Sequence, residues 1–212
     1  RRTRRRDRKR PLMNLDFAVT WDYRCPFARN FTEHVLVALQ KEPDWTVRWI
    51  PFSLNQTKVE EGGPDVWDDP AMASARLAVE VGLAVRDNFP DAFLAVHQAL
   101  FSARHDDALD IREEAVLRGV LDANGLDPGA VLAVVAGGGP RETFRREHLR
   151  AVAEHEVFGV PTVVVGANAV FVRVMNRPGG DADGARATVE RVLALVDDFP
   201  ELNEFKHTTI RR

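Results

Sequence analysis

Cys25 is the only cysteine of this 212-residue chain, and its position suits chemistry. It follows a strand-like run at residues 15–21 and directly precedes Pro26, a residue type favoured in the first turn of a helix. At a helix N-terminus, free backbone N–H groups and the positive end of the helix dipole stabilise an anion. A thiolate there has a lowered pKa and is a usable nucleophile. We therefore predict a reactive thiol at Cys25, against the alternative of a buried cysteine that only fills space.

Other side chains near this helix start are candidates for substrate contacts. Trp21, Tyr23, Phe27 and Phe52 are candidates for the wall of a groove beside the sulfur, although aromatic residues near strand ends also form core.

Several polar residues are candidates as well. Arg24 and Arg29 flank the cysteine and are candidates to support the thiolate or a substrate carboxylate. Asn176 and Arg177 lie in a late loop and are further candidate ligands. The six histidines show no metal-ligand spacing, so we expect no metal site.

The elements that must position Cys25 follow from hydrophobic periodicity and turn signals. The order is β-α-β, a helical block, then β-β-α, which predicts an α/β fold with one mixed four-stranded sheet and helices on both faces. The expected strands span residues 15–21, 45–52, 162–165 and 169–174, with a hairpin turn at 166–168. The expected helices span residues 26–39, 70–82, 88–102, 111–124, 128–136, 141–157 and 182–197.

Two short motifs resemble the DsbA-like branch of the thioredoxin superfamily. The first is WDYRCPFA at residues 21–28, and the second is GVPT at residues 159–162. That branch has a Cys-Pro-x-Cys motif at this helix start, a helical insertion of this length and a cis-proline facing the active cysteine. The chain is also similar to kappa-class glutathione transferases and 2-hydroxychromene-2-carboxylate isomerases. Residues 25–30 and 202–208 are similar to a set of actinobacterial members.

The resemblance implies a thioredoxin-like fold with an inserted all-helical subdomain. Residues 13–68 and 158–212 would form the thioredoxin-like domain, and residues 69–157 the insertion. It also implies that Pro26 begins the active-site helix and that Pro161 has a cis peptide bond. Val160 and Thr162 would then lie beside the sulfur and contact an extended substrate.

The chain departs from that branch at Ala28, which occupies the position of the second cysteine. Cys25 therefore cannot form an internal disulfide, and monothiol chemistry remains. We predict an oxidoreductase that forms a mixed disulfide with a protein or with a small thiol, mycothiol or glutathione, and that holds no tightly bound cofactor. The alternatives are a kappa-type transferase or isomerase, in which Cys25 only contacts a cofactor sulfur, and a non-catalytic binding module.

Composition and charge limit the possible partners. The chain is 45% hydrophobic, which is typical of globular proteins, and no run approaches the roughly 18 apolar residues of a membrane span. The net charge of −3 combines +7 on residues 1–10 with −10 on the rest. We expect residues 1–12 to be disordered or derived from cloning, rather than a nucleic-acid-binding arm. No secretion signal is recognisable, so we expect a cytoplasmic protein, and the kappa-type relatives suggest a homodimer.

Overall fold

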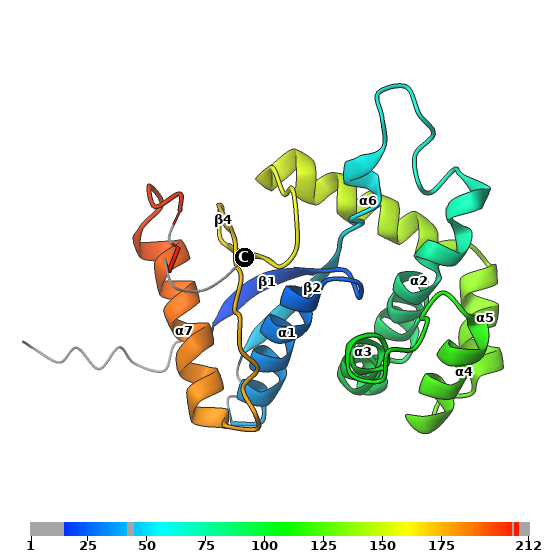
Figure 1. Cartoon of the computed structure of the whole chain (residues 1–212), viewed down its shortest axis with the longest axis horizontal. Helices are drawn as coiled ribbons and strands as arrows, with labels where there is room; N and C mark the ends of the chain where they lie inside the picture. The colour runs from blue at the N-terminus through cyan, green and yellow to red at the C-terminus, as the bar shows by residue number, and fades with distance from the viewer. Residues whose placement is uncertain (1–14, 42–44, 205, 208–212) are drawn as a thin grey trace, which may run out of the picture.

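The computed structural model describes residues 15–41, 45–204 and 206–207, and the basic arm predicted at residues 1–12 lies outside them. Figure 1 shows the strands at the centre of the molecule, with helices around them. In chain order the elements are β1 (Asp16–Trp21), α1 (Pro26–Leu39), β2 (Thr46–Pro51), the 3-10 turns η1 (Gln56–Lys58) and η2 (Pro70–Met72), α2 (Ala73–Asn88), α3 (Pro90–His105), α4 (Glu114–Ala123), α5 (Pro128–Ala136), α6 (Gly139–His155), β3 (Thr162–Val165), β4 (Asn168–Phe171) and α7 (Ala182–Asp198).

The strands form one mixed sheet in the order β2-β1-β3-β4. β1 and β2 are parallel, with Asp16 opposite Thr46 and Trp21 opposite Pro51. β3 is antiparallel to both of its neighbours, β1 and β4. Because β1 is central, its carboxyl end lies beside the end of β2 on one side and the start of β3 on the other. The residues that follow β1 are therefore close to those that follow β2 and to those that precede β3. The predicted mixed four-stranded sheet is confirmed.

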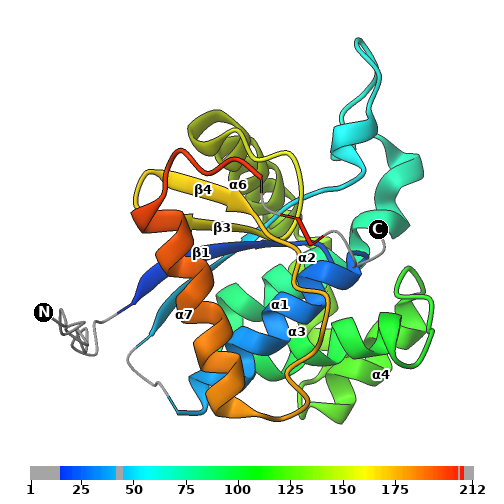
Figure 2. The same ribbon diagram turned by 60° about the vertical axis from the view of Figure 1, so that its left-hand side comes forward.

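The helices form two groups around this sheet. α1 and α7 lie side by side against one face, as Figures 1 and 2 show. The five helices α2 to α6 come between β2 and β3 in the chain, as predicted for the helical block. α2 to α5 pack together beside the sheet, and α6 packs against β2.

Most element boundaries differ from the sequence expectation by one to six residues, and two of the differences have a local cause. The first helix of the block begins at Ala73 rather than residue 70, because Asp69 caps the separate 3-10 turn η2 through a 2.9 Å bond from the Ala71 N–H. β4 (Asn168–Phe171) begins one residue earlier than expected, because the turn has two residues, with Gly166 at φ +58°, and brings Asn168 opposite Val165.

The chain after β4 is held by α1 instead of continuing the sheet. The side-chain amide of Asn30 donates to the carbonyls of Val174 and Met175, at 3.0 and 3.1 Å. His34 Nε2 lies 3.0 Å from the Asn176 carbonyl. These bonds hold residues 174–176 along the flank of the active-site helix, so the predicted strand at 169–174 ends early.

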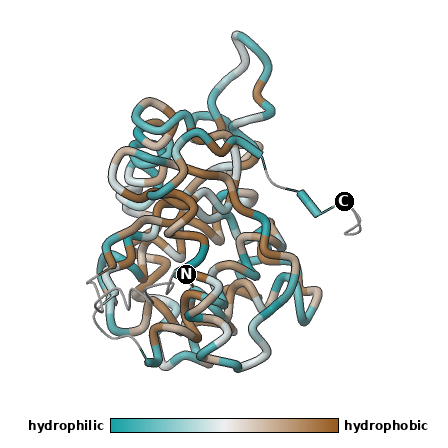
Figure 3. The backbone as a smooth tube through the Cα atoms, turned by 90° about the vertical axis from the view of Figure 1, so that its left-hand side faces the viewer, coloured by the Kyte–Doolittle hydropathy of each residue, from teal (hydrophilic) through white to brown (hydrophobic). Residues whose placement is uncertain are grey.

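The hydrophobic residues concentrate inside the molecule, as Figure 3 shows by colour. Beside the end of β1 the core is aromatic: the Trp21 and Tyr23 rings lie 4.6 Å apart, and both contact His97 of α3. The Tyr23 hydroxyl lies 2.9 Å from His97 Nδ1. Burial, with a smaller effect of Arg86, lowers the pKa of His97 to about 3, so this histidine is neutral at physiological pH. Among the described residues, no helix is long and apolar enough to cross a membrane.

This core leaves no room for a side chain at position 82 of α2. A Cβ atom at Gly82 would overlap the Tyr23 hydroxyl and lie 3.2 Å from Trp21. We predict that Gly82→Ala lowers the free energy of unfolding by about 1–3 kcal/mol, measured by urea denaturation, because overpacking outweighs the gain in helix propensity.

Gly119→Ala in α4 is the matched control. Its Cβ would meet no atom within 4 Å, so it should raise the free energy of unfolding by up to about 1 kcal/mol. Equal effects of the two substitutions would contradict this account of the core.

Candidate active site

Cys25 is the N-cap of α1, with backbone angles of φ −92° and ψ 117°. Its Sγ accepts a hydrogen bond from the Ala28 N–H at 3.4 Å, which is one of the free amides of the first turn. Pro26 occupies the start of the helix, as predicted. Cys25 is 8% exposed, so little of it is accessible to solvent.

A buried carboxylate fixes the loop that carries Cys25. Asp22, only 2% exposed, accepts hydrogen bonds from the Arg24 backbone and guanidinium and, at 3.0 Å, from the Leu54 N–H. Leu54 follows β2 just as Asp22 follows β1, so the parallel pairing brings the two together. The Cys25 N–H in turn donates to the Asp22 carbonyl at 3.0 Å. This loop is therefore tied to two strands before α1 begins.

The loop before β3 completes the site on the other side of the sulfur. The Val160–Pro161 peptide bond is cis, which confirms the expectation from the resemblance. The Cys25 thiol donates to the Val160 carbonyl at 3.2 Å. A sulfur that donates a hydrogen bond carries its proton, so the resting form of this site is the neutral thiol.

Two threonines hold this loop in place. The Thr20 hydroxyl accepts from the Thr162 N–H at 2.8 Å and donates to the Gly159 carbonyl at 3.4 Å. The Thr162 hydroxyl donates to the same carbonyl at 2.8 Å. Thr162 is 3% exposed and Val160 2% exposed, so neither side chain offers a surface to a substrate. Their part in the site is to position the Val160 carbonyl.

Burial raises the pKa of the Cys25 thiol above its ordinary value. The Ala28 and Phe27 N–H groups and the more distant Arg173 lower it, and the Asp22 carboxylate raises it. Desolvation is the largest of these effects, so the lowered pKa predicted from the helix N-terminus is wrong for the free protein. The helix amides are in place, but they do not compensate for the loss of water around the sulfur.

Four aromatic and cationic side chains lie on the segments that flank Cys25 and the cis-proline. Phe158, before the cis-proline, is 69% exposed, and its ring lies 5.3 Å from that of Phe171 at the end of β4. The guanidinium carbon of Arg173 lies 5.1 Å from the centre of the Phe27 ring and 5.3 Å from that of Phe171. We call these four residues the rim.

Three aromatic residues expected in a substrate groove lie elsewhere. Trp21, Tyr23 and Phe52 are each 0% exposed. Their rings pack against the inserted helices: Trp21 and Tyr23 contact α3, and Phe52 lies 4.3 Å from the ring of His148 in α6. They are core residues because the helical block covers this end of the sheet. Phe27 is only partly buried and is the one candidate of this group that reaches the rim.

Asn176 also lies away from the sulfur. Its carbonyl is bound to His34, nine residues after Cys25, which corresponds to about 13 Å along a helix. The expected ligand role of Asn176 beside the sulfur is therefore not supported by its position.

The three arginines that were candidates to bind the thiolate or a substrate form ion pairs with carboxylates of the protein. Arg24 binds Asp22, Arg29 binds Asp106, and Arg177 binds Glu33 with distances of 2.5 and 3.1 Å. Their charges are neutralised by carboxylates within the protein.

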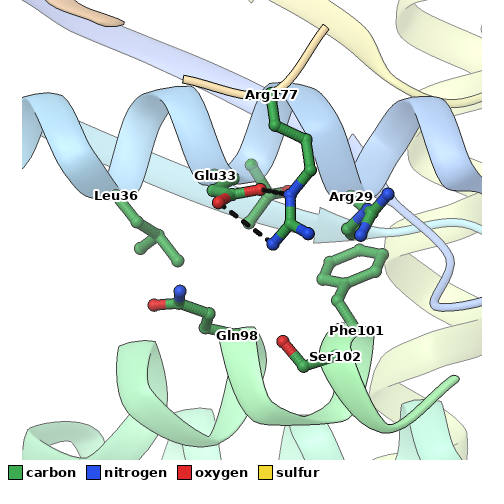
Figure 4. A pocket seen from close by; sticks show the side chains of 8 residues that line it. Arg29, Glu33, Leu36, Gln98, Phe101, Ser102 and Arg177 are labelled. Atoms are coloured by element: carbon green, nitrogen blue, oxygen red, sulfur yellow. Dashed lines mark hydrogen bonds and ion pairs between the residues drawn. The ribbon is translucent and has the colours of Figure 1, made fainter. Parts of the chain in front are cut away.

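Arg29 and Arg177 border a recess between α1 and α3, shown in Figure 4. Its cavity volume is about 10 Å³, which is hardly enough for one water molecule and far below the size of a ligand pocket. The labelled side chains lie between the two helices, with Arg177 turned toward Glu33. The recess is thus a narrow gap bridged by the ion pairs of Arg29 and Arg177 with Asp106 and Glu33.

Across the part of the chain that the structure describes, no three His, Cys, Asp or Glu residues are grouped as metal ligands. His105 also contacts the loop before Cys25, through its Nε2 atom, which lies 2.9 Å from the Tyr23 carbonyl.

Comparison with known proteins identifies a family and a fold. The model of the DSBA-like thioredoxin domain matches residues 19–176. No curated protein matches the chain.

Three similar solved structures illustrate the fold. A 2-hydroxychromene-2-carboxylate isomerase has a TM-score of 0.58 at 18% identity, over 87% of this chain and 98% of its own. Pseudomonas aeruginosa DsbA has a TM-score of 0.58 at 17% identity, over 86% and 82%. A periplasmic thioredoxin-like protein from Salmonella enterica serovar Typhimurium has a TM-score of 0.54 at 21% identity, over 87% of each chain. The predicted thioredoxin-like α/β fold is therefore confirmed.

The functional residues that sequence reasoning missed are Asp22, Thr20 and three members of the rim. A period-two pattern was the available signal for part of the rim: Arg173 comes two residues after Phe171, the last residue of β4, and alternation along an extended chain places two such side chains on one face. Phe158 carried no such signal, because its position depends on the loop before Pro161.

The pKa of Cys25 gives a prediction for its reactivity. The rate of alkylation by iodoacetamide should rise with pH as the thiolate forms. The pH at half-maximal rate should be higher for the folded protein than for the same chain unfolded in urea, because burial disfavours the thiolate. The unfolded chain is an internal control, since it holds the same single thiol. A midpoint in the folded protein at or below the unfolded one would show that the helix amides outweigh desolvation.

Proposed function

The chain belongs to the DSBA-like thioredoxin-domain family, and on this premise we propose that it is a thiol–disulfide oxidoreductase that works through Cys25 alone. The observation that carries the proposal is the meeting of the Cys25 sulfur and the Val160 carbonyl beside a cis-proline. An extended substrate placed along this loop would bring its own sulfur next to Sγ. Only one thiol is present, so the second must come from outside.

The exchange step is balanced without an additional oxidant. Cys25 loses its proton to solvent, and the thiolate attacks one sulfur of a disulfide. The Cys25 S–S bond forms as the substrate S–S bond breaks, and the departing thiolate takes up a proton from water. A second small thiol then attacks the substrate sulfur of the mixed disulfide and releases Cys25. Glutathione or mycothiol would serve as this co-substrate, in a cytoplasm that keeps thiols reduced.

The raised pKa of Cys25 affects the two halves of this cycle differently. A thiolate of higher pKa is scarcer but more nucleophilic, and it is a poorer leaving group. Release of Cys25 from the mixed disulfide is therefore the slow half in our proposal. The mixed disulfide should accumulate when the protein meets a disulfide in the absence of free thiol.

A kappa-type transferase or isomerase is the second candidate, and one observation favours it. The Cys25 thiol is held as a neutral hydrogen-bond donor. Such a donor suits contact with the sulfur of a bound thiol cofactor without a covalent bond.

Mass spectrometry of the intact protein distinguishes the candidates. After incubation with hydroxyethyl disulfide, we predict one adduct per chain, located on Cys25 and removed by dithiothreitol. Cys25→Ser should form none, and it is close to isosteric, so its thermal unfolding should remain cooperative.

Two other results would contradict the proposal. A folded wild-type protein that forms no adduct across pH 7 to 9 has no exchange activity and is left as a binding module. Glutathione conjugation activity that survives in Cys25→Ser would instead establish the transferase.

A further inference from the structure

Arg173 joins the two halves of the active site. The N–H of Val172, its neighbour, donates to the Pro161 carbonyl at 2.9 Å, so Arg173 follows directly after the strand segment bound to the cis-proline. Its guanidinium carbon lies 5.1 Å from the centre of the Phe27 ring, in the first turn of the Cys25 helix, and 5.3 Å from that of Phe171. These distances are within the range of cation–π interaction. The rings hold the cation at the rim without neutralising it.

Arg173 differs from the other arginines near Cys25 because no carboxylate among the described residues neutralises its charge. Arg24, Arg29 and Arg177 each bind a carboxylate, as described above. Arg173 is exposed, and it forms no ion pair with any residue that the structure describes. Its charge is close enough to Cys25 to act on the sulfur. The rim therefore presents one unneutralised positive charge beside the reactive thiol.

We propose that Arg173 determines specificity at this site by recruiting thiols and disulfides that carry a carboxylate near the reacting sulfur. The inference rests on the proposed function of Cys25, and it adds a substrate class. A planar guanidinium can bind a carboxylate through two parallel hydrogen bonds while its face remains on the aromatic rings. Glutathione has two carboxylates and mycothiol none, so this charge favours a glutathione-like thiol over mycothiol.

Iodoacetate and iodoacetamide are the probes for this charge. They have nearly the same size and differ by one negative charge, and both alkylate the thiolate with loss of iodide. The ratio of their rates therefore cancels any change in the pKa of Cys25. We expect Arg173→Gln to lower the iodoacetate-to-iodoacetamide ratio by about two- to fivefold at low salt, as expected for a partly exposed charge pair. Arg173→Lys should retain most of the ratio.

Arg118→Gln is the charge-matched control. Arg118 lies on α4 and is paired with Glu114, and its loss changes the net charge of the protein by the same amount. We expect an unchanged ratio in this variant. An unchanged ratio in Arg173→Gln, or an equal fall in both variants, would overturn the proposal.

A second pair of probes separates this inference from the proposed function. 3,3′-Dithiodipropionate is anionic and hydroxyethyl disulfide is neutral, and Arg173→Gln should slow mixed-disulfide formation with the anionic reagent more than with the neutral one, so that the ratio of the two rates falls. If neither reagent forms an adduct, the exchange activity fails. The alkylation ratio still decides whether Arg173 attracts anions to Cys25.

Discussion

The active site depends on a hydrogen bond between two segments that lie 135 residues apart: the Cys25 thiol donates to the Val160 carbonyl at 3.2 Å. This contact requires that the end of β1 and the start of β3 be neighbours. The antiparallel pairing of Val19 with Val163 provides this, and the Thr20 hydroxyl then binds both Gly159 and Thr162. The inserted helices leave this pairing intact because they lie beside the sheet and against β2, at the opposite side of β1 from β3.

Those parts of the fold that depend on local sequence were predictable. Alternation and Pro26 located β1 and the start of α1, and the resemblance of two motifs to the DsbA-like branch pointed to Cys25 and the cis Pro161. Burial of Trp21 and Tyr23 was not predictable in this way. Their partner His97 lies more than 70 residues away, on a helix whose packing direction no local pattern specifies. The end of β4 depended on capture of the Val174 and Met175 carbonyls by Asn30, which is also a long-range contact.

The pKa of Cys25 shows how a correct local rule was outweighed by burial. The helix amides approach the sulfur as the rule requires, with the Ala28 N–H at 3.4 Å. The sulfur is only 8% exposed, however, and its proton already has an acceptor in Val160. Ionisation would create a negative charge with little water around it and place that charge against a carbonyl oxygen. Both effects depend on the tertiary structure around Pro161, so the sequence near Cys25 could not reveal them.

The distribution of ion pairs around α1 explains why one arginine retains its influence on the sulfur. Asp22 neutralises Arg24 while fastening the loop to β2, and Asp106 neutralises Arg29 while fastening α1 to the end of α3. These ion pairs connect elements of the fold, and each neutralises a positive charge that would otherwise act on the Cys25 sulfur. The Arg173 guanidinium instead packs on the Phe27 and Phe171 rings, which hold it in place without neutralising its charge. A buried thiol that ionises with difficulty gains most from such a charge when the arriving substrate is an anion. The same guanidinium then attracts the reagent and stabilises the thiolate that attacks it.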